Sequence, residues 1–194
     1  MDKVTNIIMV GVGGQGVILA SEIVAEVMMR AGFDVKKSEV HGMAQRGGMV
    51  NSHVRFGQKV YSPVIKKGEA DILLSFEQLE TLRCLDYLTR DPVILLTSQK
   101  ISPPSVTTGS AVYPSDIPAQ LREKYPRLEL VDVLSIASKA GNIKALNIAF
   151  LGALSKYFSL QEDLWKDAIS LFVPPNDLEV NLRAFTMGRQ CSKP

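Results

Sequence analysis

A strand, a glycine-rich turn and a helix follow one another near the start of the chain, and this succession constrains the fold more than any other stretch. Ile7–Val10 is a short apolar run rich in β-branched residues, which predicts a buried strand. Apolar residues then recur with helical spacing from Val17 to Val27, so a helix is expected there. The turn between them contains four glycines, Gly11, Gly13, Gly14 and Gly16. Such a unit is typical of layered α/β folds.

The glycine turn has the chemistry of an anion site. Glycine lets other groups approach the backbone closely, and the first N–H groups of the helix suit a phosphate or carboxylate. Gly11, Gly13 and Gly16 also form the G-x-G-x-x-G spacing of dinucleotide sites. An acidic residue roughly 20 residues further on is then expected, and Glu39 is the only candidate. A bound NAD or FAD and a purely structural turn both stay open as alternatives.

The rest of the chain alternates strand and helix patterns, which predicts a three-layer α/β/α fold with a Rossmann-like, mostly parallel sheet. Val50–Phe56 alternates polar and apolar residues, and we expect Val60–Ser62 to pair back with it, giving a hairpin near residues 50–62. Other strands are predicted near residues 33–40, 71–76, 92–97 and 128–133, and other helices near 76–90, 117–124, 133–140, 142–154, 161–171 and beyond 176. No linker or repeat divides the chain.

A second glycine-rich stretch, His41–Gly48, follows the second predicted strand. It contains Gln45 and Arg46, which can donate several hydrogen bonds, directly before Gly47 and Gly48. Arginine is suited to a carboxylate or phosphate. His41 is a candidate proton donor, since histidine titrates near neutral pH. A solvated loop with a structural arginine and a hydrogen-bonding histidine is the alternative interpretation.

Composition excludes several classes of function. The net charge of +2 over 194 residues gives no argument for nucleic acid, and no apolar run is long enough to span a bilayer. Residues 1–6 show no signal-peptide pattern, and two isolated cysteines are what a reducing cytoplasm favours, so a cytoplasmic location is expected. Cys84 and Cys191 are isolated, whereas an iron–sulfur cluster takes four thiolates. Two histidines without suitably spaced acidic residues complete the prediction that the chain has no metal site.

Two segments carry a resemblance to a known family. They are Gly11–Val17 with Ala20 and Ser21, and Glu39–Gly48 with Val54 and Arg55. Together they resemble the gamma-type subunit or domain of 2-oxoacid:ferredoxin oxidoreductases, and within that family the chain is most similar to the smaller, beta subunit of the indolepyruvate type. The resemblance covers nearly the whole chain, so residues 1–194 are expected to form one gamma-type domain.

The resemblance implies an activity that this chain cannot perform alone. Members of the family oxidatively decarboxylate a 2-oxoacid with thiamine diphosphate, coenzyme A as acyl acceptor and ferredoxin as electron acceptor. No cysteine set for clusters and no G-D-G diphosphate motif is present here. The resemblance therefore implies that this chain binds none of these cofactors. Thiamine diphosphate, Mg and 4Fe-4S clusters are expected on a larger alpha subunit, within an anaerobic metabolism. The implied substrate is an arylpyruvate; pyruvate, 2-oxoglutarate or a branched-chain oxoacid stays open.

We expect the two glycine segments to lie together at the strand ends, facing the alpha subunit. The candidate anion-binding or subunit-facing residues are Gly11, Gly13, Gly14, Gln15, Gly16, Gly47 and Gly48. The catalytic candidates are His41, Gln45 and Arg46, with Gln45 and Arg46 receiving a substrate carboxylate or coenzyme A phosphates. A subunit that only supports assembly, without touching any ligand, is the competing hypothesis. The small residues of the Ala145–Ala153 helix are expected to allow close packing, either inside the fold or against a partner.

Overall fold

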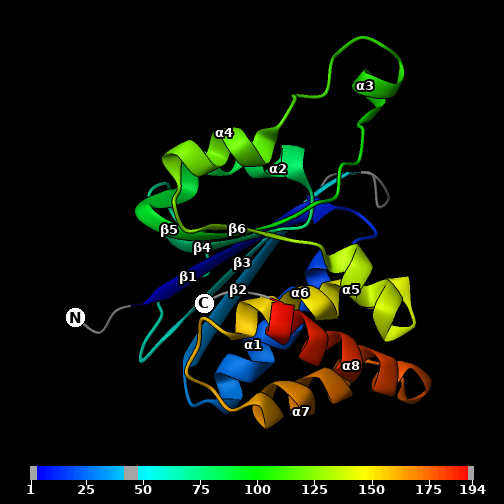
Figure 1. Cartoon of the computed structure of the whole chain (residues 1–194). Helices are drawn as coiled ribbons and strands as arrows, with labels where there is room; N and C mark the ends of the chain where they lie inside the picture. Colours follow the sequence, from blue (N-terminus) through cyan, green and yellow to red (C-terminus); the bar gives the residue numbers. More distant parts are fainter. Residues whose placement is uncertain (1–3, 42–47, 192–194) are drawn as a thin grey trace.

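A six-stranded sheet with helices on both faces forms the protein (Figure 1). The computed structural model describes residues 4–41 and 48–191. The strands lie in the order β2-β3-β1-β4-β5-β6. Their bounds are β1 Thr5–Val12, β2 Asp34–His41, β3 Met49–Gly57, β4 Ala70–Ser75, β5 Leu88–Thr97 and β6 Leu128–Val131.

The helices cover the sheet unequally. Helices α1, α5, α6, α7 and α8 lie on one face, whereas α2 and α4 cover the other (Figure 1). The helix bounds are α1 Val17–Arg30, α2 Gln78–Arg83, α3 Pro104–Thr107, α4 Ile117–Lys124, α5 Val133–Ala140, α6 Leu146–Ser155, α7 Glu162–Phe172 and α8 Pro175–Cys191, with 3-10 turns η1 Leu85–Tyr87 and η2 Ile143–Ala145. The predicted three-layer α/β/α fold is confirmed.

The sheet is mostly parallel, as predicted, but the predicted hairpin is wrong. Strands β1, β4, β5 and β6 run parallel, while β3 runs antiparallel to both β1 and β2. Residues Val60–Ser62 form no strand. Because β2 and β1 occupy both edges of β3, no edge is left for a returning strand. The antiparallel pair that does form is β2 with β3, across residues 34–57.

The helix predicted over residues 76–90 is also shorter than expected. Helix α2 ends at Arg83, a 3-10 turn follows, and Leu88 already belongs to β5. Leu88 pairs with Ala70 of β4, so the last residues of the predicted helix form a strand of the sheet instead. The apolar spacing that suggested a longer helix is that of Leu79, Leu82, Leu85 and Leu88. Leu88 is buried in the core on the α2 and α4 side, and Leu82 and Leu85 pack against that core.

Helices α6 and α8 cross at two glycines. A Cβ atom added to Gly152 would lie 2.1 Å from the Phe185 carbonyl oxygen, and one added to Gly188 would lie 1.9 Å from that of Ala149. Only glycine allows the two backbones to approach so closely. The small residues of the apolar helix therefore serve packing inside the fold.

Candidate functional site at the carboxyl edge of the sheet

The turn from β1 into α1 depends on glycine at two positions. The Gln15 N–H donates to the Val12 carbonyl oxygen at 3.1 Å, which closes the turn, and Gly14 takes a φ of +104°. Gly16 takes a φ of +77°, and its carbonyl oxygen accepts the Ala20 N–H at 2.9 Å as the helix begins. Side chains are strained in this left-handed region, so the glycines are dictated by backbone geometry.

The start of α1 has no side-chain cap. Gly16 is the N-cap and has no side chain to occupy the first N–H groups, and the first turn contains no acidic residue. Unpaired N–H groups together with the positive end of the helix dipole favour a negative charge nearby. Gly14 is exposed at the same place. The first helical N–H groups therefore have no side-chain cap, and an exposed glycine lies beside them.

Two of the residues that were predicted to face a ligand, Gly11 and Gln15, make close contacts inside the fold. A Cβ atom on Gly11 would lie 2.7 Å from Gln15 Oε1 and 2.9 Å from Phe76 Cβ, so close packing explains this glycine. The Gln15 side chain is buried: its Oε1 accepts the Val12 N–H at 2.7 Å, and its Nε2 donates to the Phe76 carbonyl oxygen at 2.7 Å and to Gln99 Oε1 at 2.6 Å. In this structure Gln15 ties three strand ends together.

The second glycine segment ends beside the first, and it begins one strand further along the same edge of the sheet. The Gly13 N–H donates to the Gly48 carbonyl oxygen at 2.8 Å, and the backbone of His41 pairs with Val50 at the end of β2. Gln45, Arg46 and Gly47 lie outside the described residues, and the description of His41 does not extend to its side chain. The flanks of the two segments therefore meet at one edge of the sheet.

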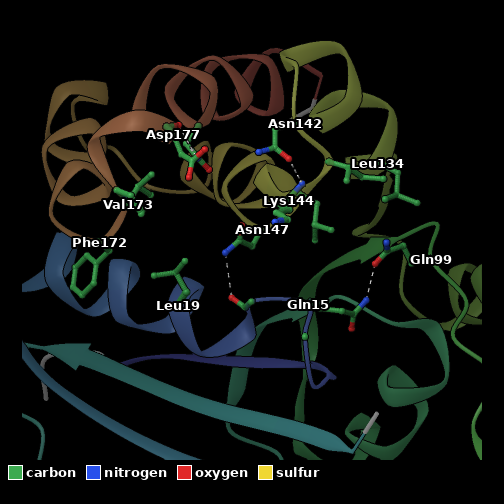
Figure 2. A pocket seen from close by; sticks show the side chains of 16 residues that line it. Gln15, Leu19, Gln99, Leu134, Asn142, Lys144, Asn147, Phe172, Val173 and Asp177 are labelled. Carbon is green, nitrogen blue, oxygen red and sulfur yellow. Dashed lines mark hydrogen bonds between the residues drawn. The ribbon is translucent and has the colours of Figure 1, made fainter. Parts of the chain in front are cut away.

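A cleft of about 560 Å³ opens next to the glycine turn (Figure 2). Its wall is mostly apolar and comes from α1, the 3-10 turn before α6, and the α7–α8 junction at Pro174. Lys144 and Asp177, both exposed, are the charged residues among those that line it. The lining residues are Gly14, Gln15, Gly16, Leu19, Gln99, Leu134, Asn142, Ile143, Lys144, Leu146, Asn147, Phe172, Val173, Pro174, Asp177 and Asn181.

Asn147 links the turn to α6 and was not anticipated from the sequence. Its Nδ2 donates to the Gly16 carbonyl oxygen at 3.4 Å, and its Oδ1 accepts the Ile148 N–H at 3.0 Å (Figure 2). A Cβ atom on Gly16 would lie only 2.5 Å from Asn147 Nδ2. An asparagine inside the apolar helix 146–155 was the available signal. For Lys144 and Gln99, no local pattern in the sequence marks a site residue.

The dinucleotide alternative loses its geometric basis. In a dinucleotide site the acidic residue ends the strand that neighbours the first one. Here β3 separates β2 from β1, and the Glu39 carboxylate pairs with Lys37 Nζ at 2.5 Å. Glu39 is therefore not placed to receive a ribose at the glycine turn.

The cysteines do not fit a metal cluster. Cys84 is buried, and burial raises the pKa of its thiol to about 11, which disfavours the thiolate that a metal requires. Cys191 is exposed at the end of α8. Within residues 4–41 and 48–191, no group of three or more His, Cys, Asp or Glu side chains is placed to hold a metal ion. Over the same residues, every helix is too short or too polar to cross a bilayer.

The chain matches a known protein family over nearly its whole length. Residues 6–191 match the family described as pyruvate ferredoxin/flavodoxin oxidoreductase. A relative from Archaeoglobus fulgidus is 42% identical over 94% of this chain and 92% of its own length. One from Thermococcus kodakarensis is 38% identical over 98% and 97%. Both relatives bear the name indolepyruvate oxidoreductase subunit IorB.

Solved structures show the same fold. The gamma subunit of a keto/oxoacid ferredoxin oxidoreductase from Geobacter sulfurreducens is 25% identical, with a TM-score of 0.69 over 96% of each chain. A 2-oxoglutarate:ferredoxin oxidoreductase from Magnetococcus marinus matches with a TM-score of 0.77 at 22% identity. That match covers 98% of this chain and 31% of the longer one.

Proposed function

Because the chain belongs to the pyruvate ferredoxin/flavodoxin oxidoreductase family, we propose that it is the smaller subunit of an indolepyruvate-type enzyme. In the proposed reaction an arylpyruvate and coenzyme A give acyl-coenzyme A and carbon dioxide, and two electrons pass to ferredoxin. The observation that supports this proposal most is the 38–42% identity to IorB relatives over nearly the full length of both chains.

The cofactors of this reaction belong on a larger, alpha subunit. A 4Fe-4S cluster takes four thiolates, whereas this chain has two cysteines, one of them buried. Thiamine diphosphate would supply the electron sink for decarboxylation from the same partner, with its Mg. This division of labour, with ferredoxin reached through the complex in the cytoplasm, rests on the family and on the donor set of this chain.

The contribution of this chain would be a rim of donors around the approach to the shared active site. The uncapped start of α1 and the exposed Lys144 lie along one edge of the sheet, and the hydrogen bond from the Gly13 N–H to the Gly48 carbonyl oxygen brings the end of the second glycine segment to the same place. Together they would receive an anionic group, either the substrate carboxylate or a coenzyme A phosphate. Arg46, with Gln45 and Gly47, belongs to this rim as a prediction from the sequence, and His41 stays a candidate proton donor.

The test uses Arg46→Ala in the co-expressed complex, with Arg122→Ala as the matched control. Arg122 is exposed on α4, across the sheet from the cleft. Loss of a charge-assisted hydrogen bond should raise the KM for indolepyruvate or coenzyme A by about tenfold or more, and the control should not change it. Unchanged assembly, Michaelis constants and turnover in Arg46→Ala would show that the rim does not bind substrate.

Substrate identity is tested in the same assay. Reduction of a viologen dye should be faster with indolepyruvate or phenylpyruvate than with pyruvate, 2-oxoglutarate or a branched-chain oxoacid. A preference for one of the small oxoacids would keep the chain in its family but reassign the substrate.

A further inference from the structure

An uncharged arm leaves the body of the molecule between β5 and α4. It comprises residues 101–115, and no charged residue occurs between Lys100 and Asp116, although 22% of the chain is charged. No residue of the arm is buried, and the Val112 and Ile101 side chains are 91% and 38% exposed. Figure 1 shows the arm, with α3 at its tip, standing away from the sheet and its covering helices. A surface without charge costs less to remove from water than a charged one.

The tip of the arm is organised by its own hydrogen bonds. The Ser105 carbonyl oxygen accepts the Ala111 N–H at 2.9 Å and the Ser110 hydroxyl at 2.8 Å. The Thr108 hydroxyl donates to the Pro104 carbonyl oxygen at 2.8 Å. These contacts fold the chain back on α3, so the arm has a defined shape before it meets anything else.

One buried carboxylate holds both ends of the arm. Glu77 is 1% exposed, and its Oε1 accepts the Ile101 N–H at 3.0 Å and the Tyr113 hydroxyl at 2.5 Å. Burial, together with this bond to Glu77, raises the pKa of Tyr113 far above its ordinary value, so the hydroxyl stays a donor. Burying a carboxylate is costly unless it is fully hydrogen-bonded. Here the buried Glu77 carboxylate is hydrogen-bonded to both ends of the arm, and it holds in place a segment that is otherwise exposed to solvent.

The base of the arm adjoins the glycine turn. Gln99, two residues before the arm, accepts a hydrogen bond from Gln15 Nε2 at 2.6 Å and lines the same cleft as Gly14 and Gly16 (Figure 2). The arm therefore starts at the edge of the sheet where the rim lies. A protein that covers this rim would also lie within reach of the arm.

We propose that the arm is a docking element for the larger subunit, with Val112 and Ile101 as its apolar contacts. This inference rests on the proposed function, because that function supplies the partner that covers the rim. The partner surface it fits is an uncharged one with an apolar depression, since the arm offers no charge to pair. Glu77 and Tyr113 act as positioning residues that hold the arm in place for docking.

The test compares Val112→Asp with Tyr61→Asp in co-expression with the larger subunit. The Tyr61 side chain is 89% exposed, as much as Val112, but it lies between β3 and β4, at the opposite edge of the sheet. A charge buried at a docked contact should weaken subunit association by about tenfold or more. Tyr61→Asp should leave association unchanged. Both isolated variants should have the same melting temperature as the isolated wild-type chain, because neither side chain is buried.

The outcomes separate this inference from the proposed function. Association of Val112→Asp that equals wild type, or an equal loss in both variants, overturns the docking role. A loss of self-association in the isolated chain, with the larger subunit still bound normally, would also overturn it and assign the arm to a second copy. If the wild-type pair assembles through Val112 but oxidises no 2-oxoacid, the proposed function fails and the docking role stands. If the wild-type subunits do not associate, both fail.

Discussion

At the scale of single residues, Gly16 has the strictest requirement at the candidate site. Its φ of +77° strains any side chain, and an added Cβ would also meet Asn147 Nδ2 at 2.5 Å. Gly14 has a φ of +104° but open space around it. A comparison of alanine substitutions at the two positions therefore separates the cost of backbone strain, present at both, from the cost of a steric conflict, present only at Gly16.

We predict that Gly16→Ala lowers the free energy of unfolding by about 2–4 kcal/mol, and Gly14→Ala by about 1–2 kcal/mol. Urea unfolding of the two variants measures the difference. Adding Asn147→Ala to Gly16→Ala should recover part of the loss by removing the steric conflict. Equal losses in the two single variants would mean that the contact with Asn147 has no energetic weight.

His53 should make stability depend on pH. It is buried, and burial, together with the nearby Arg55 charge, lowers its pKa below the ordinary value of 6.5. Its Nδ1 also accepts the Ile65 N–H at 3.1 Å, which requires an unprotonated nitrogen. The unfolded chain therefore binds a proton more readily than the folded one, so this contribution is present above pH 6.5 and is lost as pH falls through the folded pKa.

The measurement compares wild type with His53→Gln, which keeps an acceptor without a titrating ring. Between about pH 7.5 and pH 5, wild type should lose up to about 1 kcal/mol more of its unfolding free energy than the variant. Parallel pH profiles for the two proteins would contradict the assignment.

The sequence predicted some of these residues and could not predict others. The four glycines, with the strand before their turn and the helix after it, follow from local rules on backbone freedom and apolar periodicity. Gln15 was predicted to face a ligand, whereas the structure uses its amide on Phe76 and Gln99, far along the chain. Lys144 and Asn147 lie at the site because α6 and the turn before it pack beside the glycine turn, which is far away in the sequence. The local spacing of residues cannot predict such a contact.

At the scale of elements, the crossing of α6 and α8 fixes how the larger helical layer packs. Gly188 meets the Ala149 carbonyl oxygen, which belongs to a helix backbone and cannot move aside alone. Trp165 of α7 stacks on Phe185 of α8, with ring centroids 6.0 Å apart, so a displacement of α8 would also disturb the core.

Gly188→Ala should therefore lower the free energy of unfolding by at least about 3 kcal/mol. Gly32→Ala is the matched control: its φ is +88°, but an added Cβ meets nothing within 4 Å. We expect a loss of about 1–2 kcal/mol from the control. Urea midpoints give both values, and a Gly188→Ala loss no larger than that of the control would contradict the close crossing.

Most elements were predictable from periodicity, but their partners were not. The run 50–56 was correctly predicted as a strand because polar and apolar residues alternate along it. Alternation does not say which strand lies alongside, so the predicted return at residues 60–62 was wrong: β3 pairs with β2 and β1. The helix predicted at residues 76–90 was too long for a related reason: α2 ends at Arg83, and pairing with β4 overrides helical spacing at Leu88.

At the scale of the whole molecule, one edge of the sheet concentrates the features that the fold itself does not require. The uncapped start of α1, the cleft with Lys144, and the base of the uncharged arm all lie there. The net charge of the chain is only +2, so this edge is distinguished by local arrangement and not by overall charge. We propose that a larger subunit covers this edge and supplies the cofactors.

Reconstitution tests that claim most directly. The chain and the larger subunit are purified separately under anaerobic conditions, and indolepyruvate- and coenzyme A-dependent reduction of ferredoxin is measured for each alone and for the mixture. The account predicts turnover only in the mixture, saturating as the two subunits reach equal amounts. Turnover by this chain alone, or full turnover by the larger subunit without it, would contradict the account.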